Sequence, residues 1–239
     1  FNRRLDSGHL SIFREDWQRK LGLNYTDRTI SYLADRICLL ERNCRGRLAT
    51  NIEDAVLRVL VAAAVKRPNL RVIEIGTLFG IGLGMIYDHT RSRFDGVHLT
   101  GIDPLEGYYG QQPRDIITDE PIDQRTFEDN LEIARVPSED FTLIKNLSTD
   151  DLAISEAGEL AHDVLIIDGD HSYAGVKSDY VNYLHVINRG GYIVFDDYAS
   201  SDWPDVTNFV DDIVMNDNRV SLVGKSWRTA VFRVIAKSE

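Results

Sequence analysis

Cysteine is scarce in this sequence of 239 residues, and positive charge is in deficit. The two cysteines, Cys38 and Cys44, match no zinc or redox spacing, so we expect free thiols in a reducing cytoplasm. No stretch approaches the ~20 apolar residues of a membrane span, and no signal-peptide pattern opens the sequence. The net charge of −11 disfavours nucleic acid and anionic lipid as partners. We therefore predict a cytoplasmic protein that binds neither.

Apolar residues make up 43% of the sequence, which suits one compact domain. Over residues 10–68 the apolar residues recur three and four apart, which is typical of helices. Beyond residue 70, short β-branched runs alternate with helical segments, which predicts a doubly wound α/β fold with a mostly parallel sheet. Two final runs joined at 226–228 predict an antiparallel edge hairpin, which makes seven strands. The other expected strands are 70–76, 97–103, 141–148, 163–168 and 190–197.

Three glycines, Gly76, Gly80 and Gly82, follow the first expected strand, which contains Glu74. A strand that turns into a helix through glycines lets a ligand approach the backbone. Asp103 ends the second strand, where a carboxylate can accept both hydroxyls of a ribose. The glycines alone are equally compatible with tight packing, but together with Asp103 they favour nucleoside binding.

Three aspartates stand at the ends of two later strands. Asp168 ends one, and Asp196 and Asp197 end the next. Because neighbouring strands lie ~4.8 Å apart, these carboxylates can converge, and their repulsion then requires a cation or raised pKa values. Oxygen ligands suit Mg²⁺ or another divalent cation. The alternative is that these aspartates cap helices or lie in solvated turns. His171 follows three residues after Asp168 and is either a general base or a helix-capping side chain.

The segments IEIGTLFGIG, GIDP, LIIDGDHSY and GGYIVFDDY together resemble class I S-adenosylmethionine-dependent methyltransferases. The resemblance covers residues 50–239 and implies a Rossmann-like methyltransferase fold, with residues 1–49 as a helical extension that serves as a lid or oligomer contact. It implies that the Gly76–Gly82 loop holds the methionine part of the cofactor, above Glu74. It further implies that Asp103 holds the ribose and that Ser148 lies near the adenine.

Within this family, the sequence is most similar to the metal-dependent branch of catechol-type and natural-product sugar O-methyltransferases. That similarity implies that Asp168, Asp196 and Asp197 bind Mg²⁺ or another divalent cation. It also implies that His171 is the base, with Asp168 contributing to catalysis and to the cofactor site. A histidine at 171 favours a sugar or glycosylated natural product as acceptor, with a phenol or catechol second.

Two alternatives remain open at this point. Cephalosporin-hydroxylase-like enzymes share the acidic motifs, and a non-catalytic nucleotide-binding domain could retain the fold. Residues 104–125 have little regular pattern and predict a long loop, a candidate lid that carries Tyr108, Tyr109, Gln111 and Gln112.

Overall fold

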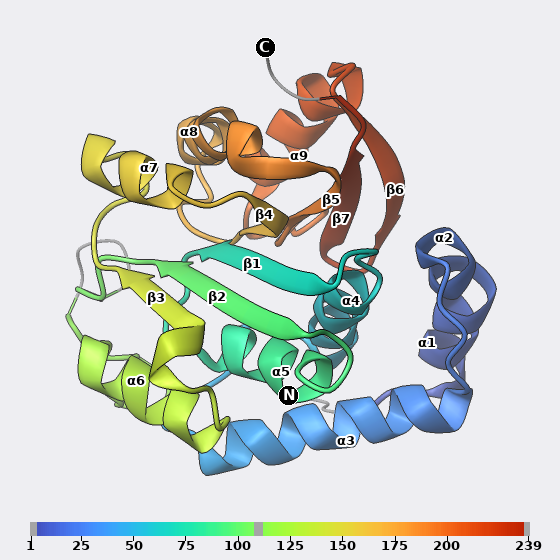
Figure 1. Ribbon diagram of the computed structural model, residues 1–239, viewed down its shortest axis with the longest axis horizontal. Helices are drawn as coiled ribbons and strands as arrows, with labels where there is room; N and C mark the ends of the chain where they lie inside the picture. Colours follow the sequence, from blue (N-terminus) through green and yellow to red (C-terminus); the bar gives the residue numbers. More distant parts are fainter. Residues whose placement is uncertain (1–3, 108–111, 237–239) are drawn as a thin grey trace.

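The computed structural model describes residues 4–107 and 112–236, which form a seven-stranded sheet covered by helices (Figure 1). The strand order is β3-β2-β1-β4-β5-β7-β6, and β7 runs antiparallel to both of its neighbours. This confirms the predicted mostly parallel sheet with an antiparallel edge hairpin. The strands are β1 (Asn69–Ile75), β2 (Gly96–Ile102), β3 (Phe141–Ile144), β4 (His162–Ile167), β5 (Ile187–Phe195), β6 (Val220–Ser226) and β7 (Thr229–Val234).

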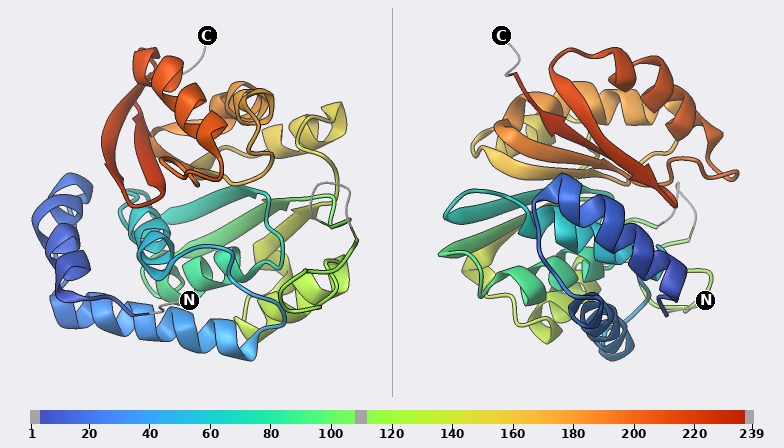
Figure 2. Two further views of the ribbon diagram at one scale, coloured as in Figure 1. Left: turned by 180° about the vertical axis from the view of Figure 1, so that it is seen from behind. Right: turned by 90° about the vertical axis from the view of Figure 1, so that its right-hand side faces the viewer.

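Helices pack on both faces of the sheet because its strands are apolar on both sides (Figures 1 and 2). In β4, Val164 and Ile166 pack into one core, whereas Leu165 and Ile167 pack into the other. The first face carries α4 (Ile52–Ala63), α5 (Ile81–Thr90) and α6 (Gln124–Ile133). The second carries α7 (Asp151–Gly158), α8 (Tyr173–Tyr183) and α9 (Pro204–Asp212). None of the helices in the described ranges is long and apolar enough to cross a membrane.

The N-terminal segment is part of the first core. It consists of α1 (Ser7–Ile12), a π-helical turn η1 (Phe13–Trp17), α2 (Gln18–Leu21) and α3 (Asp27–Asn43), which packs against α4 and α5 (Figure 2). The Trp17 side chain is fully buried, and its Nε1 donates to Ser226 Oγ at 3.0 Å. The Phe13 ring packs against Trp227 in the β6–β7 turn, at 4.8 Å between ring centroids. A lid or oligomer role for this segment stays a prediction.

The structure differs from the expected elements around β5 and β3. The helix expected to reach residue 188 ends at Tyr183, and a 3₁₀ turn, η3 (Leu184–Val186), leads into β5. Asn188 Nδ2 donates to Asp163 Oδ1 at 2.9 Å, which holds the start of β5 beside β4. β3 ends at Ile144 rather than residue 148 because the next residues turn. Two further 3₁₀ turns are η2 (Ser138–Asp140) and η4 (Val214–Asn216).

Replacing Trp17 tests whether the N-terminal segment belongs to the core. We expect Trp17→Ala to lower the free energy of unfolding by about 3–5 kcal/mol, because it removes a fully buried ring and its hydrogen bond. Urea denaturation measures this loss. Tyr32→Ala in α3, where the side chain is 63% exposed, is the matched control and should change the value by less than about 0.5 kcal/mol. Equal effects of the two substitutions would contradict the assignment.

Candidate active site

The carboxyl ends of β1, β2 and β4 border a cavity of ≈ 400 Å³. This edge of an open parallel sheet is where such folds bind ligands. Of the residues singled out from the sequence, the cavity wall includes Gly76, Asp103, Ser148, Asp168, His171 and Asp197. The fold therefore brings the expected ribose residue and the expected base to one cavity.

Close packing explains two of the glycines that follow β1. Gly76 has φ +81°, and a Cβ there would lie 2.0 Å from the Asp168 carbonyl oxygen, so no other residue fits. A Cβ on Gly82 would lie 2.9 Å from Glu74 Oε1, which places Glu74 directly beneath the turn. Glu74 and Gly82 line a smaller neighbouring cavity of ≈ 30 Å³. Gly80 instead caps α5 and faces the Phe127 ring.

Asp103 fixes the two loops that border the cavity. Its Oδ2 accepts the backbone N–H of Leu78 and its Oδ1 that of Leu105, each at 2.8 Å. Both leucines have positive φ, 49° and 52°, a conformation that costs energy and needs such support. Burial raises the pKa of Asp103, although the backbone donors lower it. Each carboxylate oxygen has a second lone pair, so Asp103 can still accept a ligand hydroxyl.

Ser148 lies in the loop after β3 and lines the same cavity. Its Oγ donates to Asp179 Oδ1 in α8 at 2.6 Å. Burial raises the pKa of Asp179 to about 7, although the bond from Ser148 lowers it. Asp179 was not singled out from the sequence, because a helical carboxylate looks like a surface residue until the packing of α8 is known.

The acidic end of the cavity centres on His171. Its Nε2 lies 3.4 Å from Asp168 Oδ1 and 3.2 Å from Asp197 Oδ2, and its ring stacks on Trp203 at 4.8 Å between centroids. Burial lowers the pKa of His171, but Asp168, Asp197 and Asp196 outweigh burial and raise it. The imidazole is thus held in one orientation between two carboxylates.

A second cation at this site was not predicted from the sequence. Arg58 of α4 is only 2% exposed. Its Nη2 lies 2.9 Å from Asp168 Oδ2 and 2.5 Å from Asp196 Oδ2, and its Nη1 lies 3.4 Å from Glu74 Oε1. The available signal was an arginine in the middle of the apolar run AVLRVLVAA, where a charge requires a buried partner.

Burial and the ion pairs shift the pKa values of the acidic residues in opposite directions. Burial raises the pKa values of Glu74 and Asp196, each to about 8, although Arg58 lowers both. Arg58 and His171 outweigh burial at Asp168 and lower its pKa. Asp168 and Asp196 form ion pairs with Arg58, whereas Asp197 forms one with Arg228 of the β6–β7 turn.

The three aspartates expected to bind a metal lie close together, but they do not share one coordination point. The Arg58 guanidinium bridges Asp168 and Asp196, whereas Asp197 pairs with Arg228 and His171. Throughout residues 4–107 and 112–236, no group of three or more His, Cys, Asp or Glu side chains is placed to hold a metal ion. The predicted ligand set therefore does not fit Mg²⁺ in this arrangement, because a protein cation occupies its centre.

The predicted loop of 104–125 is anchored on the N-terminal segment. Asp115 is 2% exposed and accepts hydrogen bonds from Arg47 Nε at 3.1 Å and from Thr118 N at 2.8 Å. Glu120 pairs with Arg45 at 2.9 Å. The candidate lid residues Tyr108, Tyr109 and Gln111 lie outside the described residues, whereas Gln112 is exposed.

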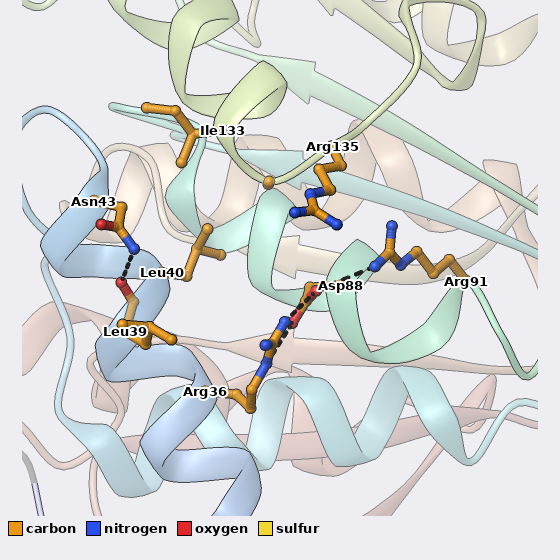
Figure 3. Close-up of a pocket in the computed structure, with 9 residues that line it drawn as sticks. Arg36, Leu39, Leu40, Asn43, Asp88, Arg91, Ile133 and Arg135 are labelled. Atoms are coloured by element: carbon orange, nitrogen blue, oxygen red, sulfur yellow. Dashed lines mark hydrogen bonds and ion pairs between the residues drawn. The ribbon is translucent and has the colours of Figure 1, made fainter.

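A second hollow, of ≈ 210 Å³, lies between the C-terminal parts of α3 and α5 and the end of α6 (Figure 3). In it, Asp88 pairs with Arg36 at 2.8 Å and with Arg91 at 3.7 Å. These side chains pair with one another, and the Arg91 cation at the C-cap of α5 also complements the exposed carbonyl groups there. The hollow lies at the far end of α5 from the glycine turn, so the first cavity is the candidate active site.

The family model described as "Methyltransferase domain" matches residues 73–198, more than half of the 239 residues. The chain belongs to this methyltransferase family. The matched part runs from β1 to just beyond β5, so it contains the glycine turn, Asp103 and the acidic end of the cavity.

The chain is also similar to individual proteins and solved structures. The uncharacterized protein R132 of Acanthamoeba polyphaga mimivirus is 33% identical over 157 residues, which are 64% of this chain and 63% of R132, so the match spans less than two thirds of that relative. The O-methyltransferase from Bacillus cereus in complex with SAH has a TM-score of 0.53 at 16% identity, covering 93% of this chain and 97% of that one. CalS11, a TDP-rhamnose 3′-O-methyltransferase of calicheamicin biosynthesis, has a TM-score of 0.55 at 13% identity, covering 84% and 93%. These two structures share the fold.

Asp103→Asn tests how the two loops beside the cavity are held. The asparagine keeps the size of the side chain but turns one acceptor into an NH₂ group that faces a backbone N–H. We expect the free energy of unfolding to fall by about 1–3 kcal/mol, measured by chemical denaturation. Asp95→Asn at an exposed position is the control and should change it by less than about 0.5 kcal/mol. An Asp103→Asn variant as stable as the control would show that the loops do not depend on this carboxylate.

Proposed function

We propose that this methyltransferase transfers the methyl group of S-adenosylmethionine to a hydroxyl oxygen of a small polar acceptor. The observation that carries the proposal is the single cavity that joins the glycine turn and Asp103 at one end to Asp168 and His171 at the other. A cofactor and an acceptor bound in such a cavity are neighbours. The family match and the fold shared with an SAH-bound O-methyltransferase support the same conclusion.

Residues at the ends of β1 to β3 would hold the cofactor, which supplies an electrophilic methyl group on a sulfonium when it is bound. Gly76 and Leu78 of the turn line the cavity, as does Asp103, whose remaining lone pairs suit the ribose hydroxyls. Ser148 and Leu147 line the part next to β3, which suits the adenine. Glu74 supports the turn from below through its contact with the Gly82 position.

His171 would accept the proton of the acceptor hydroxyl. Its ring is fixed by Trp203, and Asp168 and Asp197 stabilise the imidazolium that forms when the proton is transferred. The oxygen gains nucleophilic character as it loses the proton, and holding it beside the methyl group supplies much of the rate by proximity. These steps use only groups of the protein. The divalent cation that the sequence predicts at Asp168, Asp196 and Asp197 has no role in these steps, because Arg58 and Arg228 already pair with those carboxylates.

A sugar or glycosylated natural product is the acceptor that we favour, and a phenol or catechol is second. The acidic end of the cavity offers carboxylate and imidazole groups, which hydrogen-bond to several hydroxyls more readily than they pack against an aromatic ring. CalS11, which shares the fold, is itself named as a sugar O-methyltransferase. A role in natural-product biosynthesis follows as part of the same proposal.

Methyl transfer from labelled S-adenosylmethionine to a panel of nucleotide sugars, glycosides and catechols tests this function. We expect label in a sugar product. His171→Gln should lower kcat by about 10²–10⁴-fold, because it removes the base, while the affinity for S-adenosylhomocysteine measured by calorimetry stays within twofold. His185→Gln, at an exposed histidine of η3, is the matched control and should keep full activity.

The other outcomes separate the alternatives. Binding of S-adenosylhomocysteine without transfer to any acceptor would indicate a non-catalytic nucleotide-binding domain. Failure to bind it at all, together with oxidation of an acceptor, would favour a hydroxylase-like enzyme on the same fold. If the His171→Gln enzyme keeps the full rate, His171 is not the base, but the proposed methyltransferase activity is unaffected.

A further inference from the structure

We propose that Arg58 is the resident cation of the acidic site and takes the place that the sequence assigns to a divalent metal, so that methyl transfer requires no metal. The inference rests on the proposed function for its catalytic part only. Its structural part, a guanidinium in place of a metal ion, can be tested without any turnover.

The position of Arg58 provides the first argument. The guanidinium lies among three carboxylates that come from three different strands, Glu74 in β1, Asp168 after β4 and Asp196 after β5. A single nitrogen, Nη2, is within 2.9 Å of both aspartates, so the point at which a metal would bridge them already carries positive charge. The side chain is 3% exposed and rises from a helix buried on nearly all sides, so it has no solvent to which it could withdraw.

The charges around the site provide the second argument. Asp197, the third expected ligand, is already paired with Arg228 and lies against His171. Arg228 is itself held by Ser200 Oγ at 2.9 Å, and its backbone N–H donates to Asp54 Oδ1 at 3.1 Å. Asp54 stands one helical turn before Arg58, so α4 positions both cations of the site. A metal would have to displace an arginine from a carboxylate, and a displaced Arg58 guanidinium would be left buried beside a divalent cation.

This arrangement also gives Arg58 a positioning role. It fixes Asp168 Oδ2, which leaves Oδ1 directed at His171 Nε2. Arg58 does not line the larger cavity and contacts the base only through Asp168. We therefore expect its loss to affect kcat through the orientation of His171, with KM for the cofactor little changed.

Metal binding to the unmodified protein is the first test. After chelation, wild-type protein should show no Mn²⁺ binding by electron paramagnetic resonance and no change in Tm with Mg²⁺. Its rate of methyl transfer should change by less than twofold with or without chelator. Stoichiometric Mn²⁺ binding, or a tenfold loss of rate on chelation, would overturn the proposal. If no acceptor is ever methylated, the spectroscopic and thermal results still decide it, so its failure is distinguishable from that of the proposed function.

Replacing the cation is the second test. Arg58→Met should lower Tm by roughly 10 °C, because three buried carboxylates lose their partner. It should also gain Mn²⁺ binding that raises Tm again. The double variant Arg58→Met/Asp196→Asn should recover part of the loss, since it removes one of the buried carboxyl groups that has lost its partner. Arg125→Met, at a side chain that is 86% exposed, is the control and should match the wild type.

If Arg58→Met does not fold, Arg58→Lys answers the same question. It keeps the charge at a single point but cannot bridge Asp168 and Asp196 together with Glu74. We expect a folded protein with a lowered kcat and an unchanged KM for S-adenosylmethionine. An Arg58→Met protein as stable as Arg125→Met, an Arg58→Met protein that binds no Mn²⁺, or an Arg58→Lys enzyme with wild-type kcat would each contradict the proposal.

Discussion

The buried ion-pair cluster around Arg58 is the constraint on which the candidate site depends. One guanidinium from α4 meets carboxylates from β1, β4 and β5, and so joins one helix to three neighbouring strand ends. Charges are costly to bury unless each has a partner with good geometry. The cluster therefore favours one relative placement of these elements. It also positions His171, because His171 contacts Asp168.

The part of the cavity next to Asp103 is held together by hydrogen bonds rather than by ion pairs. Asp103 binds backbone N–H groups of two loops whose leucines occupy a strained conformation, so the loops are already formed before a ligand arrives. The Gly76 backbone packs directly on that of Asp168, which links the two ends of the cavity through main-chain contact. A site that is preformed in this way loses less conformational entropy on binding.

The sequence was sufficient to predict the sheet, its edge hairpin and the strand ends at which the site lies, because alternating buried strands and glycine turns leave local signals. It also placed Asp103, Asp168 and His171 at one edge, since the carboxyl ends of parallel strands always meet there. Arg58 could not be found in this way. An arginine in an apolar run indicates that a partner is buried with it, but which carboxylates it meets depends on which face of α4 packs against β1 and β4, and that is a tertiary contact. The same holds for Asp179, which becomes a partner of Ser148 only when α8 docks.

The contact between Trp17 and Ser226 joins positions 209 residues apart in the chain. During synthesis on the ribosome, Phe13 and Trp17 are made about 210 residues before the β6–β7 turn that covers them. Contacts so distant in sequence slow folding and leave apolar surface open to aggregation in the meantime. A nascent chain of this protein would thus leave the segment around Phe13 and Trp17 open to chaperone binding until the β6–β7 turn has been made.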